Sequence, residues 1–355
     1  MSDRTATEQS RTIGAGTDDD RPFRLGLLLH VDGDVPPRQA YRDAIDLVVQ
    51  AEEAGYDSVW VVARHFRQGN EHISAPLVAL AAMAEHTSRI RLGTAVLVLP
   101  LEDPVRVAED AAVLDALSGG RLELGIGSGP FPGAWEAFGR DLADRHPLFG
   151  ESVARLHEVL EGAPLNSLGE TLHPPAPGVR SRLWQATSGD PTVARESVIA
   201  AARAGDGLQL SRATDWSRNQ GEQDQADLVT AYRDAWARPD RPPRILVSRA
   251  VYPHADESTA LAALTPGAAR WQQWLGRLGH HGVAEATAEE FLDRDHTRFG
   301  SPERIAEGLA RDPALREATD LLVSFVPGAP DHAEHLRLIR DTADQIAPHL
   351  GWRPL

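Results

Sequence analysis

The sequence predicts an α/β protein with a (β/α)8 TIM-barrel fold, and three observations support this prediction. Eight short apolar runs follow one another along the chain, at residues 24–30, 57–62, 91–99, 121–127, 183–187, 207–210, 244–252 and 320–326. Helical patterns lie between most of them, for example at residues 38–54, 75–86, 104–117, 192–204, 226–237 and 331–347. Such alternation is typical of a parallel sheet, whose buried strands are continuously apolar, as these runs mostly are. Eight units fit a closed barrel with insertions better than an open sheet, which usually has fewer strands.

The surplus length lies in two insertions. Residues 160–182 are rich in Pro and Gly, and residues 255–300 contain Trp271 and Trp274. Long connections in a barrel usually lie at the C-terminal ends of the strands, where they act as lids, so we expect both insertions at that face. Neither insertion has enough strands for a second domain. Residues 23–355 are therefore predicted to form one domain.

Composition excludes several classes of protein. The 355 residues include 36 Lys and Arg against 52 Asp and Glu, a net charge of −16, whereas binding nucleic acid or an anionic membrane requires a basic surface. The absence of Cys excludes disulfides, thiolate catalysis and Cys-ligated metal centres. Residues 1–22 are polar and lack the apolar core of a signal peptide, so they are predicted to be a disordered tail. No apolar stretch reaches the roughly 18 residues of a membrane span, and a cytoplasmic protein is expected.

The second strand is followed by Arg64 and His65. The C-terminal ends of barrel strands hold the active site in TIM-barrel enzymes. An imidazole beside guanidinium groups is a candidate proton donor or acceptor, because neighbouring charges shift its pKa. We therefore consider His65 a candidate catalytic residue, with Arg64 beside it. A hydrogen bond from His65 to a loop carbonyl is the alternative role.

Gly127, Ser128 and Gly129 follow the fourth apolar run. They are not part of a dinucleotide-binding fingerprint, because Pro130 and Pro132 interrupt the helix that such a motif must open. The missing side chains at the two glycines would let a planar ligand or a phosphate approach the main chain. A tight barrel turn without a ligand is the alternative.

Thr187, Ser188 and Gly189 follow the fifth apolar run and lead into a predicted helix. Hydroxyl groups and free backbone N–H groups at a helix N-terminus bind anions, and the helix dipole favours this further. The next two residues, Asp190 and Pro191, also form an ordinary helix start. The segment is therefore either a phosphate site or a helix cap.

Motifs for other chemistries are missing from the sequence. There is no HExxH, GxxxxGK[ST] or GxSxG motif, which zinc proteases, P-loop proteins and hydrolases with a nucleophile elbow require. The His280-His281 and Glu71-His72 pairs have no third ligand at a convincing spacing. No metal site is predicted.

Several linked motifs occur in order along the chain. AEEAGYDSVW at residues 51–60 leads into Arg64-His65-Phe66, LDALSGGR at residues 114–121 leads into LGIGSG at residues 124–129, and FGSPERI lies at residues 299–305. Together these motifs resemble the bacterial luciferase-like monooxygenase superfamily. The resemblance implies a (β/α)8 barrel that uses reduced flavin or a deazaflavin.

The resemblance also implies roles for individual residues. A flavin would lie over the C-terminal ends of the strands. The family's loop for the ribityl phosphate corresponds to Thr187, Ser188 and Gly189. Ser128 falls at a flavin or phosphate contact, and Arg145 lies near a position where some members supply a phosphate-binding arginine. A homodimer is expected from the resemblance and because symmetric dimers are common.

Departures from the family pattern bear on the cofactor. Many members carry Glu-His-His or Gln-His-His after strand 2, where this chain has Ala63-Arg64-His65 and so only the second imidazole. Sugar dehydrogenases that use the deazaflavin coenzyme F420 resemble this chain at His65, but pair it with a Trp and a Glu. Here the corresponding residues are Gly69 and Ser128. The absence of both partners favours FMN.

The leading hypothesis is a two-component monooxygenase. Reduced FMN, supplied by a separate flavin reductase, would react with O2 and oxygenate a small organic substrate. No NAD(P)H fingerprint is present, which supports an external reductase. His65 would exchange a proton near the flavin, and Arg64 would stabilise negative charge on the reduced ring. The alternatives are an F420-dependent reductase or dehydrogenase that transfers hydride, a barrel that binds flavin without turnover, and a metal-dependent hydrolase.

Overall fold

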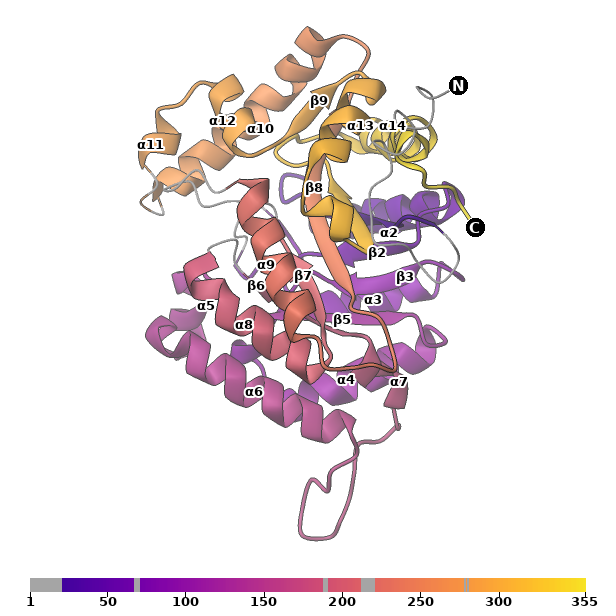
Figure 1. Ribbon diagram of the computed structural model, residues 1–355, viewed down its shortest axis with the longest axis vertical. Helices are drawn as coiled ribbons and strands as arrows, with labels where there is room; N and C mark the ends of the chain where they lie inside the picture. Colours follow the sequence, from indigo (N-terminus) through magenta and orange to yellow (C-terminus); the bar gives the residue numbers. More distant parts are fainter. Residues whose placement is uncertain (1–20, 67–70, 188–190, 212–220, 278, 280) are drawn as a thin grey trace.

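The computed structural model describes residues 21–66, 71–187, 191–211, 221–277, 279 and 281–355, and it confirms the predicted barrel (Figure 1). Eight parallel strands lie in the order β10-β1-β2-β3-β5-β6-β7-β8, and pairing of β8 with β10 closes the barrel. These strands are β1 (Arg24–Leu29), β2 (Ser58–Val61), β3 (Arg91–Thr94), β5 (Leu122–Gly127), β6 (Leu183–Thr187), β7 (Gly207–Leu210), β8 (Ile245–Pro253) and β10 (Asp320–Ser324).

Helices alternate with the strands and surround the barrel (Figure 1). They are α2 (Pro37–Glu53), α3 (Pro76–Ala84), α4 (Pro104–Leu117), α5 (Pro132–Ala137), α6 (Arg145–Leu160), α7 (Pro177–Ser181), α8 (Pro191–Ala204), α9 (Glu222–Ala235), α10 (Glu257–Arg277), α11 (His281–Ala284), α12 (Ala288–Arg294), α13 (Pro302–Arg311) and α14 (His332–Asp341). Several begin at a proline, which fits the first turn because no N–H is needed there. The side chain of Asp103 caps α4 by accepting hydrogen bonds from two backbone N–H groups.

Two strands differ from the prediction. The apolar run at residues 91–99 divides into β3 and β4 (Leu97–Val98), with a cis peptide bond between Ala95 and Val96. β4 pairs with β5 beyond the point where β3 ends. A short strand that the sequence did not predict, β9 (Arg298–Gly300), pairs with the end of β8 inside the second insertion.

The interior of the barrel is filled by large side chains below its C-terminal end. Trp60, Trp184, Leu246 and Leu322 form a buried cluster, and the two tryptophan rings meet edge to face with their centroids 5.5 Å apart. A second, larger apolar core lies between the strands and the surrounding helices.

A buried ion-pair network closes the N-terminal end of the barrel. Glu123 accepts a hydrogen bond from Arg91 Nε at 2.5 Å and one from Trp184 Nε1 at 2.6 Å, and Arg244 Nη1 lies 3.8 Å away. Burial by itself would raise the pKa of the Glu123 carboxyl. The positive charges of Arg91, Arg244 and Arg24 outweigh burial and hold that pKa below its usual value.

The two insertions lie at opposite ends of the barrel. Residues 255–300 follow β8 and form α10, α11, α12 and β9 over the C-terminal ends of the strands, as predicted. Residues 160–182 instead connect the end of α6 to the start of β6, so the expectation of a second lid is wrong. A connection from a helix to the next strand must return to the N-terminal end of the barrel, and Figure 1 shows this loop protruding away from α10.

The folded part of the chain includes Arg21, two residues before the predicted start at residue 23. Arg21, assigned to the tail by sequence, is buried and donates hydrogen bonds to Asp57 Oδ1 at 2.7 Å and to the Arg353 carbonyl at 3.2 Å. The remainder of the predicted tail, residues 1–20, lies outside the described residues. Among the helices that the structure describes, none combines the length and the apolar character needed to cross a membrane.

Candidate active site

A cavity of about 660 Å³ opens at the C-terminal ends of the barrel strands. Its floor includes Leu28, Leu246 and Leu322, which belong to or contact the tryptophan cluster below. Its walls come from the ends of β1, β2 and β4 to β8, from the first turn of α6 and from α10, which supplies Trp271, Trp274 and Leu275. The volume lies within the range of roughly 300–1,000 Å³ typical of small-molecule sites.

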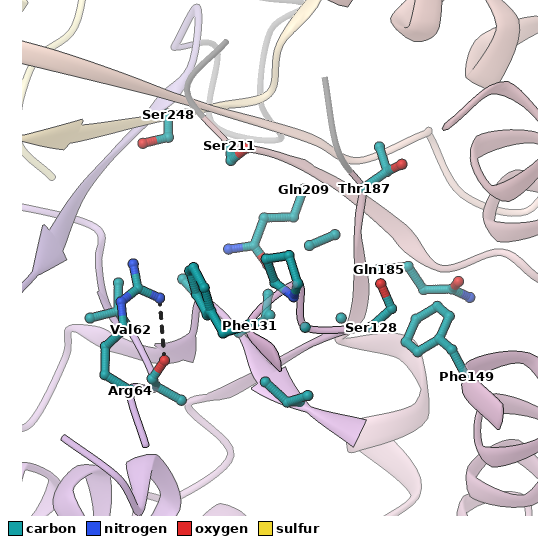
Figure 2. A pocket seen from close by; sticks show the side chains of 18 of the residues that line it. Val62, Arg64, Ser128, Phe131, Phe149, Gln185, Thr187, Gln209, Ser211 and Ser248 are labelled. Carbon is teal, nitrogen blue, oxygen red and sulfur yellow. Dashed lines mark hydrogen bonds between the residues drawn. The ribbon is translucent and has the colours of Figure 1, made fainter. Parts of the chain in front are cut away.

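Most of the candidate residues from the sequence line this one cavity. They come from three different strand ends and from α6, and are Arg64, His65, Gly127, Ser128, Gly129, Arg145 and Thr187. Ser188 and Gly189 lie outside the described residues. Figure 2 shows Arg64 and Phe131 on one side of the cavity and Ser128, Thr187 and Phe149 on the other, with Gln209 between them.

Packing against neighbouring side chains requires glycine at positions 127 and 129. A Cβ atom on Gly127 would lie 2.6 Å from Val96 Cγ2, and one on Gly129 would lie 2.4 Å from Val98 Cγ1. Close packing against these two valines therefore requires glycine whether or not a ligand binds. Only Ser128, between them, presents a polar side chain to the cavity.

Hydroxyl groups and a guanidinium line the side of the cavity formed by β5, β6, α6 and α8. Ser128, Thr187 and Ser197 supply the hydroxyls, and Arg145 begins α6. Arg145 forms no ion pair with a carboxylate in the described part of the chain, and its Nε donates to His146 Nε2 at 3.0 Å. Burial, followed by the charge of Arg145, lowers the pKa of His146. This side of the cavity therefore carries positive charge and hydrogen-bond donors, which suit an anionic ligand group.

His65 lies at the rim between two aromatic rings. Its ring centroid is 5.1 Å from that of Phe138 and 6.0 Å from that of Phe66. Burial lowers the pKa of the imidazole, so His65 is neutral at pH 7. A neutral imidazole can both donate and accept a proton.

Arg64 belongs to a wall of aromatic side chains. Its guanidinium carbon lies 5.3 Å from the centroid of the Phe131 ring, and Phe131 contacts Trp274 with centroids 5.2 Å apart. Trp271 meets Trp274 edge to face at the same centroid distance. Arg64 also donates to the Ala63 carbonyl at 3.3 Å. Apart from Arg64, this side is aromatic, in contrast to the hydroxyl-lined side.

Several polar residues of the cavity were not singled out from the sequence, among them His30, Gln209 and Ser248. His30 directly follows β1, and its Nδ1 lies 2.7 Å from Glu71 Oε1. Gln209 on β7 and Ser248 on β8 are almost fully buried, yet Gln209 Oε1 and Ser248 Oγ have no hydrogen-bond partner in the structure as described. The same inspection of strand ends that singled out His65 applies to His30, which is the last residue of the first apolar run. No local signal marks Gln209 or Ser248, because they lie within strands.

The described residues contain no group of three or more His, Cys, Asp or Glu side chains arranged to hold a metal ion. The polar groups of the cavity are instead spread over several strands and helices. Such an arrangement fits a large organic ligand that hydrogen bonds at several points.

Parts of the chain are similar in sequence to known oxidoreductases. The chain is 40% identical over 134 residues to 4-hydroxyprotoasukamycin monooxygenase of Streptomyces nodosus subsp. asukaensis, which covers 38% of this chain and 36% of that protein. It is 38% identical over 124 residues to F420-dependent glucose-6-phosphate dehydrogenase of Amycolatopsis mediterranei, which covers 34% of this chain and 36% of that protein. In these matches the chain spans about a third of the length of its curated relatives.

A solved structure shares the whole fold. The oxygenating constituent of 3,6-diketocamphane monooxygenase from Pseudomonas putida, solved in complex with FMN, superimposes with a TM-score of 0.73 at 19% identity, covering 92% of this chain and 98% of that one. At this identity the likeness shows the fold alone. The family model of luciferase-like monooxygenases matches residues 22–342. The chain therefore belongs to the luciferase-like monooxygenase family.

Proposed function

We propose that the protein is a monooxygenase that uses reduced FMN, supplied by a separate flavin reductase, and O2 to oxygenate a small organic substrate. The observation that carries this proposal is the division of one cavity into a hydroxyl- and arginine-lined side and an aromatic side. A flavin phosphate has a place on the first side, and an apolar substrate has a place on the second. The neighbours in the family include proteins named for FMN or for F420, which supports a flavin-type cofactor.

The residues present fit FMN. Ser128, Arg145 and Thr187 would hold the phosphate through charge-assisted hydrogen bonds. Gln209 and Ser248 carry buried polar atoms without partners, and a buried polar group of this kind is costly unless a ligand satisfies it. The polar atoms of a flavin ring are suitable partners for both.

The protein itself contributes orientation, charge and exclusion of water. When bound, reduced FMN supplies the electrons and the reactive oxygen chemistry. Arg64 places positive charge beside the ring-binding space, and His65 exchanges protons at the rim. α10 covers the cavity with Trp271 and Trp274 and keeps water from the reacting atoms.

A deazaflavin-dependent hydride transfer is the second candidate, because one relative is named as an F420-dependent dehydrogenase. By resemblance, Ser128 occupies the position of a glutamate in the F420-dependent sugar dehydrogenases. Gly69 corresponds to their tryptophan and lies outside the described residues. Loss of that acid favours the oxygenase.

Anaerobic binding distinguishes the two candidates. Reduced FMN and reduced F420 are each titrated into the protein without O2, and the bound cofactor is then mixed with O2 in a stopped-flow spectrometer. The oxygenase predicts tight binding of reduced FMN and a transient flavin absorbance that requires O2. Tight binding of F420 alone, without such a transient, would overturn the proposal.

The proposal includes a homodimeric state. A homodimer is supported by three exposed apolar residues on adjoining helices, Val78 on α3 and Val113 and Leu117 on α4. Light scattering of the purified protein and of V113R tests the homodimer, because a charge at the contact would yield monomers.

We also propose one cytoplasmic domain over residues 23–355, with α10 as its lid.

A further inference from the structure

We propose that the substrate is an aromatic compound with an acidic hydroxyl group, and that His30, oriented by Glu71, takes the proton from that hydroxyl. The inference rests on the proposed function, since it assigns the substrate half of the same cavity. It assigns the proton transfer from the substrate to His30, whereas His65 exchanges protons at the rim of the cavity.

His30 and Glu71 form an imidazole–carboxylate pair at the end of β1. His30 Nδ1 lies 2.7 Å from Glu71 Oε1, and both side chains are largely buried, with 15% and 6% of their surface exposed. A carboxylate only accepts hydrogen bonds at neutral pH, so Nδ1 carries the hydrogen. This leaves Nε2 as the nitrogen of His30 that can accept a proton, and His30 is one of the residues that line the cavity.

Glu71 orients the imidazole of His30. In catalytic triads a carboxylate bound to one ring nitrogen likewise holds the ring in place without becoming protonated. The other charged or titratable groups that face His30 are Arg64, whose Nε lies 3.9 Å from Glu71, and three groups that border a neighbouring small cavity together with His30. These three are Asp32, Arg270 and His335. Burial, followed by the charges of His30 and His332, lowers the pKa of His335 to about 3, so His335 adds no positive charge at neutral pH.

The aromatic wall lies beside this pair. Trp271 borders both the main cavity and the small cavity of about 80 Å³ that His30 also borders. From Trp271 the wall continues through Trp274 and Phe131 to Arg64, with ring or cation contacts of 5.2 to 5.3 Å. A planar ring can pack against such faces by offset or edge-to-face contact. Its hydroxyl group then has an imidazole and a guanidinium on the same side of the cavity.

The proton transfer balances within these groups. The hydroxyl O–H bond breaks, the proton forms a bond to His30 Nε2, and the electron pair stays on the oxygen. Glu71 keeps its hydrogen bond to Nδ1–H, and Arg64 offsets the negative charge on the oxygen. The resulting ring is richer in electrons than the neutral one, which makes it a better acceptor for the oxygen atom that the proposed reaction delivers.

His65 provides a matched comparison. It lines the same cavity, but its neighbours are Phe66 and Phe138, and it contacts no carboxylate within the described part of the chain. Burial lowers its pKa. Replacing His65 therefore removes an imidazole from the cavity without removing the pair.

The probe for the test is 4-nitrophenol, whose ionised form is coloured. Full-length protein is titrated with it from about pH 5 to pH 8, where an imidazole changes its charge. We expect the apparent pKa of bound 4-nitrophenol to lie at least one unit, a tenfold change in the ionisation constant, below that of the free probe in the wild type and in H65Q. In H30Q the shift should be lost, and in E71Q it should be reduced.

A second measurement follows His30 directly. Nitrogen NMR of the protein without ligands should show the hydrogen of the neutral His30 ring on Nδ1 in the wild type. Unchanged thermal unfolding of H30Q and E71Q would show that these variants are folded. If H30Q does not fold, E71Q still tests the pair. A wild type that does not bind 4-nitrophenol, or an H30Q variant that ionises it as the wild type does, overturns the inference.

FMN binding in the same variants separates this inference from the proposed function. If His30 ionises the probe but reduced FMN does not bind, the proposed function fails and the pair stands. If reduced FMN binds and reacts with O2 while the ionisation of the probe is independent of His30, the proposed function stands and this inference fails.

Discussion

The polar groups at the two ends of the barrel differ in the partners they have. At the N-terminal end, Glu123 is surrounded by Arg91, Arg244 and the Trp184 N–H, and Arg24 Nε lies 3.0 Å from Asp320. At the C-terminal end, Gln209 and Ser248 are equally buried, but one oxygen atom of each has no partner in the described structure.

This difference separates stability from function within one fold. Charges that are paired and hydrogen bonded hold strands together, whereas buried polar atoms without partners cost free energy unless a ligand completes them. In TIM barrels the N-terminal end carries stability and the C-terminal end carries catalysis. Substitutions at the two ends should therefore have separable effects.

The largest effect on stability is expected from E123Q. Loss of the carboxylate leaves Arg91 and Arg244 beside a buried neutral amide, and breaking a buried pair costs about 3–5 kcal/mol. Urea unfolding measures the change. The control is E109Q, whose partner Arg106 is exposed, and which should change the free energy of unfolding by about 0–1 kcal/mol. Equal effects of the two substitutions would contradict the assignment of the N-terminal network to stability.

The contribution of Glu123 should also depend on pH. Because the folded protein holds the pKa of Glu123 below its usual value, the stabilisation is complete above about pH 4.5 and is lost as the pH falls through the lowered pKa. The difference in the free energy of unfolding between wild type and E123Q should therefore shrink below about pH 4. A difference that is constant with pH would show that the carboxylate charge is not responsible.

At the C-terminal end, R145Q should weaken binding of reduced FMN by about tenfold or more, since a hydrogen bond to a charged group contributes about 1.5–3 kcal/mol. Its free energy of unfolding should stay unchanged, because Arg145 pairs with no carboxylate of the described structure. R155Q on the same helix, where Arg155 pairs with exposed Glu158, is the matched control and should bind FMN normally. Normal FMN binding by R145Q would remove this arginine from the phosphate site.

S248A should leave the protein as stable as before, or more stable by about 1 kcal/mol, because it deletes a buried hydroxyl without a partner. T94V is the control, since the Thr94 hydroxyl donates to the Gly125 carbonyl at 2.6 Å and accepts from its N–H at 2.8 Å. Its removal should cost about 1–3 kcal/mol. If S248A is as destabilising as T94V, Ser248 has a structural partner and is not reserved for a ligand.

The smallest expected effect is a pH dependence at the rim. Burial lowers the pKa of His65, so the folded protein binds its proton less readily than the unfolded chain. The wild type should therefore lose stability relative to H65Q as the pH falls below about 6.5, the ordinary pKa of His. Thermal unfolding of both proteins between neutral and mildly acidic pH measures this. The opposite sign would indicate that the imidazolium is stabilised in the fold.

The sequence by itself determined the barrel and most of the strand ends that form the site. Periodicity and apolar runs are local properties, and the order of eight of them leaves few topologies. Strand ends follow from the same runs, so Arg64, His65, Ser128 and Thr187 could be named in advance. The predicted position of residues 160–182 was wrong, because a segment between a helix and the next strand returns to the N-terminal end.

Only the tertiary structure decided which of these groups have partners. The pairing of His30 with Glu71 joins residues 41 positions apart, and the network around Glu123 joins four different strands. Whether Gln209 and Ser248 are satisfied depends on side chains from several strands at once. Hydrogen bonding and burial are set by atoms that meet only when the barrel closes, and no local pattern in the chain records them.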